Sequence, residues 1–195
     1  MFSFFKKKTE LVMDRSSIVP RIKHANMLAA LVETGAPPSE LPFTEPLVAD
    51  LLIAYAFDQP GMFQMVKVSD LQRLGLTPSE LRDLAMENLG RQLTDIRAKG
   101  QGTPIIWLTA GEDLGACLLL LDKLWKDLAK QLPGEIVVSV PDRGTVFATS
   151  TEWTGGLELL RVFTDGAIER ADTHRLTEHF LVRRQGRWVP FEGSA

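Results

Sequence analysis

The stretch that most constrains the fold is residues 45–93, which combines two strand-like runs, a tight turn and a clearly marked helix start. Residues 47–57 are apolar at nearly every position, and this pattern predicts a strand that is buried on both faces or covered by a helix. The Gln-Pro-Gly sequence at 59–61 predicts a turn, and the alternation in residues 62–68 predicts a second strand. Strands joined by a tight turn pair antiparallel, so we expect a hairpin here.

The helix that follows has the clearest start signal in the chain. Thr77 is suited to the N-cap, Pro78 to the first helical position, and Glu80 completes a capping box with Thr77. The apolar residues then recur at helical spacing, which predicts an amphipathic helix from residue 78 to about residue 93. Its buried stripe is expected to consist of Leu81, Leu84, Ala85, Leu89 and Leu93.

Turn residues and periodicity predict the remaining elements. They are an extended segment at 17–23, a short helix at 25–33, a strand at 105–109, a helix at 114–131, a hairpin of 135–140 and 145–149, a helix at 152–169, and a closing hairpin of 178–183 and 187–191. This order predicts an α+β fold: a mixed, mainly antiparallel sheet built from hairpins, with three long helices packed on it. A doubly wound nucleotide-binding fold is disfavoured.

Length and charge predict one globular domain with basic ends. The chain has 195 residues, of which 45% are hydrophobic, and this suits a single α+β domain at 17–193 preceded by a flexible basic tail at 1–16. The net charge is −3, with +4 in residues 1–23, +2 in residues 174–195 and −9 between them. An acidic body disfavours nucleic acid as a partner. The terminal hairpin, with Arg183, Arg184, Arg187 and Trp188, suits either stacking on a single strand or a solvated sheet edge.

Cysteine usage and the N-terminus bear on the compartment. Cys117 is the only cysteine, which excludes an intrachain disulfide and favours a cytoplasmic protein. The opening MFSFFKKKTE has too few apolar residues for a signal peptide core or a membrane span. It fits either a frayed terminus or a weak contact of the tail with an anionic membrane surface.

Several segments together resemble a known family. IVPRIK, EPLVADLLIAYAFD, LTPSELRDLAMENL, TAGEDLGACLLLLDKLW and EIVVSVPDRG occur in the same order as in the YtpQ-like family, an uncharacterised bacterial family classed as a domain of unknown function. The resemblance covers residues 18–191. It implies a bacterial cytoplasmic domain and carries over no catalytic or binding residue.

Sequence patterns for specific chemistry are few. His24, His174 and His179 form no metal-binding motif, and Cys117 lies on an apolar stripe where packing is favoured over a nucleophilic role. We therefore expect no metal and no cofactor. Asp50 and Asp58 are too far apart along an extended strand to act as a catalytic carboxylate pair.

Two polar residues stand at positions expected to be buried. Tyr55 shares strand parity with apolar neighbours, and Asn88 lies on the apolar stripe of its helix. Each needs a hydrogen-bond partner, either within the protein or in a ligand pocket. The favoured function is a non-enzymatic protein-binding or interaction module. The alternative is a small-molecule hydrolase or transferase with a pocket near Tyr55, Asn88 and the Asp142-Arg143 turn; the oligomeric state is left open.

Overall fold

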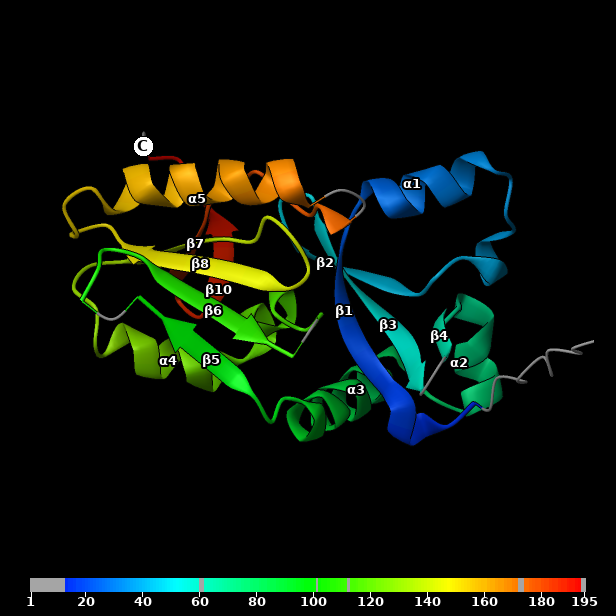
Figure 1. The fold of residues 1–195 in the computed structure, drawn as a ribbon. Coiled ribbons are helices and arrows are strands. Elements are labelled where there is room, and N and C mark those ends of the chain that lie inside the picture. Colours follow the sequence, from blue (N-terminus) through cyan, green and yellow to red (C-terminus); the bar gives the residue numbers. More distant parts are fainter. Residues whose placement is uncertain (1–12, 60–61, 101, 112, 172–173, 194–195) are drawn as a thin grey trace, which may run out of the picture.

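Two antiparallel sheets with helices packed against them form the described part of the chain (Figure 1). The computed structural model describes residues 13–59, 62–100, 102–111, 113–171 and 174–193. Most of the predicted tail at 1–16 thus lies outside the described residues. The 3₁₀ helix η1 (Arg15–Ser17) begins the described elements, and the Arg15 guanidinium donates to the carbonyl of Leu74.

The first sheet has the order β1-β3-β2, and β4 also pairs with β3. Its strands are β1 (Ile18–His24), β2 (Thr44–Val48), β3 (Leu51–Gln59) and β4 (Met62–Met65). Successive strand residues face opposite sides of the sheet. One side carries Ile22 opposite Ile53 and packs against α3 (Pro78–Gln92), which crosses below β1 and β3 in Figure 1. The other side carries Arg21 and faces the second sheet's loops.

The apolar run at 47–57 is not one strand, so that prediction is wrong. Ala49 has φ +50°, and the chain reverses at Ala49 and Asp50, so that Val48 pairs with Leu51. An alanine in the left-handed region costs free energy and carries none of the usual turn chemistry, which is why the pattern did not indicate a turn. The predicted hairpin with the next strand is present as β3 and β4, whose turn lies partly outside the described residues.

The second sheet has the order β10-β9-β7-β8-β6-β5. Its strands are β5 (Ile96–Lys99), β6 (Ile106–Ala110), β7 (Ile136–Ser139), β8 (Thr145–Ser150), β9 (Leu181–Arg184) and β10 (Arg187–Pro190). The helix α5 (Gly156–Arg170) lies along the face that carries Val137 and Phe147, at the top of Figure 1. The opposite face, with Val138 and Val146, packs against the segment 116–129.

The α+β prediction is confirmed, with differences in detail. The strands form two sheets rather than one, and every described pairing is antiparallel. The predicted helix at 114–131 is divided into the 3₁₀ helix η3 (Ala116–Leu120) and α4 (Asp122–Ala129). The shorter elements are α1 (Asn26–Glu33), η2 (Pro38–Glu40) and α2 (Val68–Leu74). None of the helices in the described ranges is long and apolar enough to cross a bilayer.

A continuous hydrophobic core joins the two sheets. It runs from Ile22 and Leu89, beside the first sheet, to Leu118, Trp125 and Trp188, beneath the second. Because the two sheets share this core, the loops between them are held close together. Those loops line cavities beside the first sheet.

Candidate functional site

Asn88 fastens α3 to the start of the first sheet. Its side chain is 2% exposed, and Nδ2 donates to the carbonyl oxygens of Arg15 and Ile18, at 2.8 Å each. The two acceptors lie 73 and 70 residues before Asn88 in the sequence. The side-chain amide therefore joins segments that no local hydrogen bond connects. These contacts match the structural role, in which Asn88 fixes the helix against the sheet.

Replacing Asn88 with alanine is expected to lower the free energy of unfolding by about 1–3 kcal/mol, because two carbonyls at the start of the first sheet lose their donor. Asn88→Leu should not restore stability, since the carbonyls stay unsatisfied and the longer apolar chain needs room. Urea denaturation followed by circular dichroism measures both variants. A loss below about 0.5 kcal/mol in each would contradict the structural role.

Tyr55 belongs to a second set of bonds on the same side of the first sheet. Its hydroxyl donates to Oε2 of Glu45 at 2.5 Å, and Arg82 of α3 binds the same carboxylate at 2.8 Å. Burial, followed by the Glu45 carboxylate, raises the pKa of Tyr55 well above its usual value, so the phenol stays protonated. Tyr55 therefore ties β3 to β2 and, through Glu45, to α3.

Asp142 and Arg143 lie elsewhere, in the turn between β7 and β8. Oδ1 of Asp142 accepts a hydrogen bond from the amide of Gly144 at 2.7 Å, an arrangement that shapes the turn. Arg143 extends from this turn toward the face of the first sheet opposite Tyr55. The structure thus brings Asp142 and Arg143 together, and it places Tyr55 and Asn88 on the other side of the sheet.

The cavity that Arg143 lines has a volume of about 350 Å³ and lies between the two sheets. We call it the cationic cavity. Its charged lining residues are Arg21 and Lys23 of β1, Asp58 of β3, Asp113 of the loop after β6, and Arg143. Arg21 and Lys23 both reach the cavity because side chains alternate along β1, so residues 21 and 23 share one face. The lining is completed by uncharged residues: Ile22, Phe63 of β4, Ala116 and Cys117.

Ion pairs hold two of the three cations. Arg21 contacts Oδ2 of Asp58 at 2.5 Å and also donates to the carbonyl of Asp113 at 3.3 Å. Nε of Arg143 lies 2.6 Å from Oδ1 of Asp113. The side chain of Lys23 has no ion pair or hydrogen bond with any residue in the described ranges, and its ammonium lies 5.8 Å from the centre of the Phe63 ring. The cavity lining therefore carries a positive charge in excess of its two carboxylates.

The electrostatics of Lys23 follow from this arrangement. Burial, and then the charges of Arg143 and Arg21, lower the pKa of the Lys23 ammonium from its usual value. A negatively charged group beside Lys23 would offset both effects. The lysine is thus the cation in the cavity with the most to gain from an anion.

Sequence reasoning did not identify Arg21, Lys23, Asp58 or Asp113 as members of one site. A weak signal was present, because two basic residues two apart in an otherwise apolar strand must share a face. Pro20 obscured it by making the segment look like irregular extended chain. Asp113 could not be connected with them, since it lies 92 residues after Arg21.

Cys117 is buried at the edge of the cavity, as the apolar stripe predicted. Its thiol donates to the carbonyl of Pro20 at 3.4 Å, and burial raises its pKa to about 11. A thiol with so high a pKa is a poor nucleophile near neutral pH. Cys117 contributes packing here rather than chemistry.

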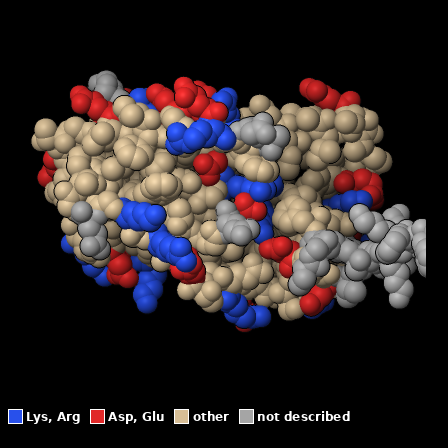
Figure 2. Space-filling model, in the orientation of Figure 1, with Lys and Arg blue, Asp and Glu red and all other residues tan. Residues whose placement is uncertain are grey.

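Neighbouring hollows share lining residues with the cationic cavity, and we call this series of hollows the intersheet groove. One hollow shares Arg143 and Asp113 with the cavity and extends to Arg170. Others lead past Lys23 and Arg175 to His179. Figure 2 shows Lys and Arg atoms, interspersed with Asp and Glu atoms, down the middle of this face of the molecule.

At the far end of the groove the fold gathers two histidines around Asp50. Nε2 of His24 lies 3.1 Å and Nε2 of His179 lies 3.8 Å from Oδ2 of Asp50. Nδ1 of His24 accepts a hydrogen bond from the amide of Asn26, so a neutral His24 carries its proton on Nε2, the nitrogen nearer to Asp50. That tautomer does not offer Nε2 to a metal, and the described residues contain no group of three or more ligands arranged for one.

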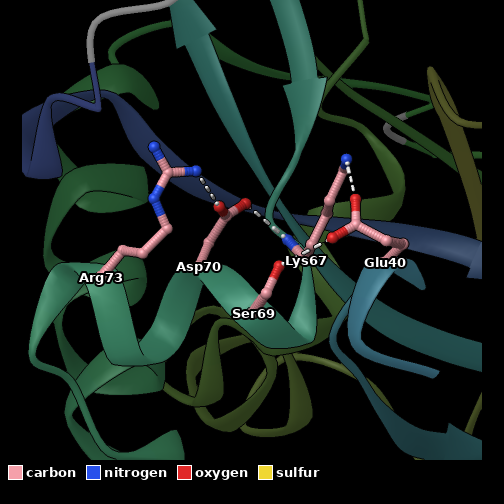
Figure 3. Close-up of polar contacts among 5 residues, drawn as sticks. All are labelled: Glu40, Lys67, Ser69, Asp70 and Arg73. Atoms are coloured by element: carbon pink, nitrogen blue, oxygen red, sulfur yellow. Dashed lines mark hydrogen bonds and ion pairs between the residues drawn. The ribbon is translucent and has the colours of Figure 1, made fainter. Parts of the chain in front are cut away.

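Another polar cluster has a structural explanation. Oδ2 of Asp70, a buried residue, accepts from the amide of Lys67 at 3.0 Å, while Arg73 lies 3.3 Å from its other oxygen (Figure 3). Lys67 also pairs with Glu40 at 2.6 Å. These contacts cap the start of α2 and join it to η2.

The terminal hairpin does not present an aromatic platform. Trp188 is buried against Trp125 and donates from Nε1 to the carbonyl of Leu119 at 2.9 Å. Arg183 and Arg184 pair with Asp122 and Glu135. Trp188 is thus not positioned to stack on a nucleic-acid base.

Comparison with known proteins finds distant bacterial relatives. A UPF0354 protein of Listeria welshimeri is 25% identical over 169 residues, which cover 83% of this chain and 61% of the relative. A UPF0354 protein of Listeria monocytogenes is 22% identical over 165 residues, covering 82% and 60%, and one of Bacillus cytotoxicus is 28% identical over 95 residues, covering 48% and 35%. No family model and no solved structure matches the chain.

These relatives form an uncharacterised bacterial family, as the sequence resemblance predicted. The designation YtpQ is not among the names they carry. The chain spans about 60% of the length of the first two relatives, and their names state no ligand or activity.

Proposed function

We propose that the chain is a non-enzymatic protein-binding module, working in the bacterial cytoplasm, whose binding surface is the intersheet groove. The observation that carries the proposal is the excess positive charge in the cationic cavity, where Lys23 and Arg143 face the same hollow. The rest of the body is acidic, so this hollow is a local exception. A partner with an acidic segment would be complementary to it, and complementary charge favours both specificity and rapid association.

The polar groups of the cavity support binding better than catalysis, because most of them are already paired or unreactive. In the cavity, Arg21 and Arg143 already pair with Asp58 and Asp113, and the thiol of Cys117 has a raised pKa. The alternative, a hydrolase or transferase pocket near Tyr55, Asn88 and the Asp142-Arg143 turn, has less support. Tyr55 and Asn88 bond to protein groups on the opposite face of the first sheet.

A charge-reversal experiment tests the proposal. Tagged wild-type chain, Lys23→Glu and the control Lys123→Glu are used to capture proteins from the native bacterial cell, and retained proteins are quantified by mass spectrometry. Lys123 is an exposed residue of α4, so the control makes the same charge change away from the groove. Circular dichroism checks that the variants keep their fold.

We expect at least one protein to be retained by wild type and by Lys123→Glu, and to be reduced at least about tenfold by Lys23→Glu, because an attraction becomes a repulsion at the binding surface. The same interaction should weaken as salt is added. If every retained protein binds Lys23→Glu as well as wild type, or if none is retained, the proposal is wrong.

A further inference from the structure

The charge of the cationic cavity limits what it can accept. Its lining has three cations and two carboxylates, and both carboxylates are already engaged by Arg21 and Arg143. One positive charge is left over, beside Lys23. A group with one negative charge would neutralise it, whereas a phosphate dianion would leave an excess of negative charge near Asp58 and Asp113.

The available donors suit a planar anion. The ammonium of Lys23 has three N–H donors, and none of them bonds to an acceptor in the described ranges. Arg143 meets Asp113 through Nε, and its guanidinium carries four further N–H donors. A carboxylate between them would receive charge-assisted bonds from two side chains on different segments, β1 and the turn after β7.

Arg21 acts as a positioning residue rather than a direct contact. Its side chain is 12% exposed and is held by Asp58 and by the carbonyl of Asp113. Its Nε is buried and has no partner in the described ranges. Arg21 therefore adds positive potential behind the cavity and fixes the distance between β1 and the loop that carries Asp113.

Phe63 adds an apolar wall. Its side chain is half exposed, and the guanidinium carbon of Arg21 and the ammonium of Lys23 lie 5.5 and 5.8 Å from the ring centre. A hydrocarbon or aromatic chain attached to the anion would pack against this ring. At about 350 Å³, the cavity is at the small end of ligand sites, which suits a small acid or one acidic side chain.

We infer that the cationic cavity is a receptor for a single carboxylate, bound by Lys23 and Arg143, with the group that bears it packed on Phe63. The carboxylate has two possible sources, an Asp or Glu side chain of a partner protein or a free small organic acid. The first source rests on the proposed function, and the second does not.

NMR titration of the ¹⁵N-labelled full chain tests this inference. The probes are phenylacetate, its neutral isostere phenylacetamide, inorganic phosphate, and the capped peptide Gly-Phe-Glu-Gly with a Gln version as its control. Lys23→Gln removes the key charge with little change of size. Lys123→Gln is the matched control on the exposed face of α4.

We expect phenylacetate to shift the amide signals of residues 21–23 and 143 at millimolar concentration, and phenylacetamide to shift them little. Lys23→Gln should weaken phenylacetate binding at least about tenfold, and Lys123→Gln should leave it unchanged. The inference is overturned if phenylacetate causes no shift, if the amide binds equally well, if Lys23→Gln has no effect, or if phosphate binds more tightly.

The peptide arm separates the two sources. Tighter binding of the Glu peptide than of phenylacetate, lost in the Gln peptide, supports a partner's side chain as the ligand. If phenylacetate binds and the Glu peptide does not, the result supports a free acid as the ligand. The carboxylate receptor then stands, and the protein-binding function fails. Partner capture that depends on Lys23, without binding of any carboxylate probe, would leave the proposed function standing and overturn this inference.

Discussion

Replacing Trp125 with alanine is expected to lower the free energy of unfolding by about 3–5 kcal/mol, the range for removing a large aromatic ring from a core. Trp125 is fully buried, and its ring meets that of Trp188 edge to face, with centres 4.9 Å apart. Its Nε1 donates to the carbonyl of Leu118 at 2.6 Å, where η3 passes into α4. The alanine variant loses packing, a ring pair and this bond together.

Urea denaturation of the variant, followed by circular dichroism, measures the loss. Trp125→Phe is the control, because it keeps an aromatic ring and removes the N–H, so we expect a smaller loss of about 1–3 kcal/mol. A loss below about 1 kcal/mol for Trp125→Ala would show that the two sheets do not depend on this contact for their shared core.

Gly115→Ala is expected to cost about 3 kcal/mol or more, the upper end for added bulk at a packed position. A Cβ at residue 115 would lie 2.0 Å from the carbonyl oxygen of Gly144 and 2.2 Å from its carbonyl carbon. Both are backbone atoms, so no side-chain rotation can relieve the clash. The loop after β6 and the turn after β7 would have to separate, which breaks the hydrogen bond from the Ala116 amide to the Arg143 carbonyl.

This substitution also tests the cationic cavity, because the same contact places Arg143 opposite β1. We expect Gly115→Ala to weaken phenylacetate binding even at temperatures where the variant is folded. Gly90→Ala is the matched control: its Cβ would meet nothing within 4 Å, and alanine is preferred over glycine in a helix, so stability should stay equal or rise by about 0.5–1 kcal/mol. Equal stability of Gly115→Ala and wild type would contradict the close backbone approach.

The candidate site was only partly predictable. Tyr55 and Asn88 were expected to be buried and bonded, and both are, because strand parity and helical spacing decide which residues point inward. The Asp142-Arg143 turn was also expected, since Pro, Asp and Gly favour turns. The positions that face Arg143 were not predictable, because they depend on which loop the second sheet presents to β1.

The sequence by itself determined the elements whose ends are marked by capping or turn residues, because those residues act through local hydrogen bonds and backbone preferences. The start of α3 is an example: Thr77 and Glu80 bond each other's backbone, with the Thr77 amide 2.8 Å from Glu80 Oε2. The closing hairpin is another, since Gln185 and Gly186 both take positive φ in a two-residue loop. Such bonds join residues within a few positions, so they depend on residue type and spacing alone.

Only the tertiary structure decided the turn at Ala49, the division into two sheets, and the meeting of Lys23 with Arg143. Ala49 adopts a conformation that alanine disfavours, and pairing of the two flanking strands compensates for it. The cationic cavity joins segments as far apart in sequence as Arg21 and Asp113. Contacts at that separation form because the shared core brings the sheets together, and no pattern of neighbouring residues encodes their geometry.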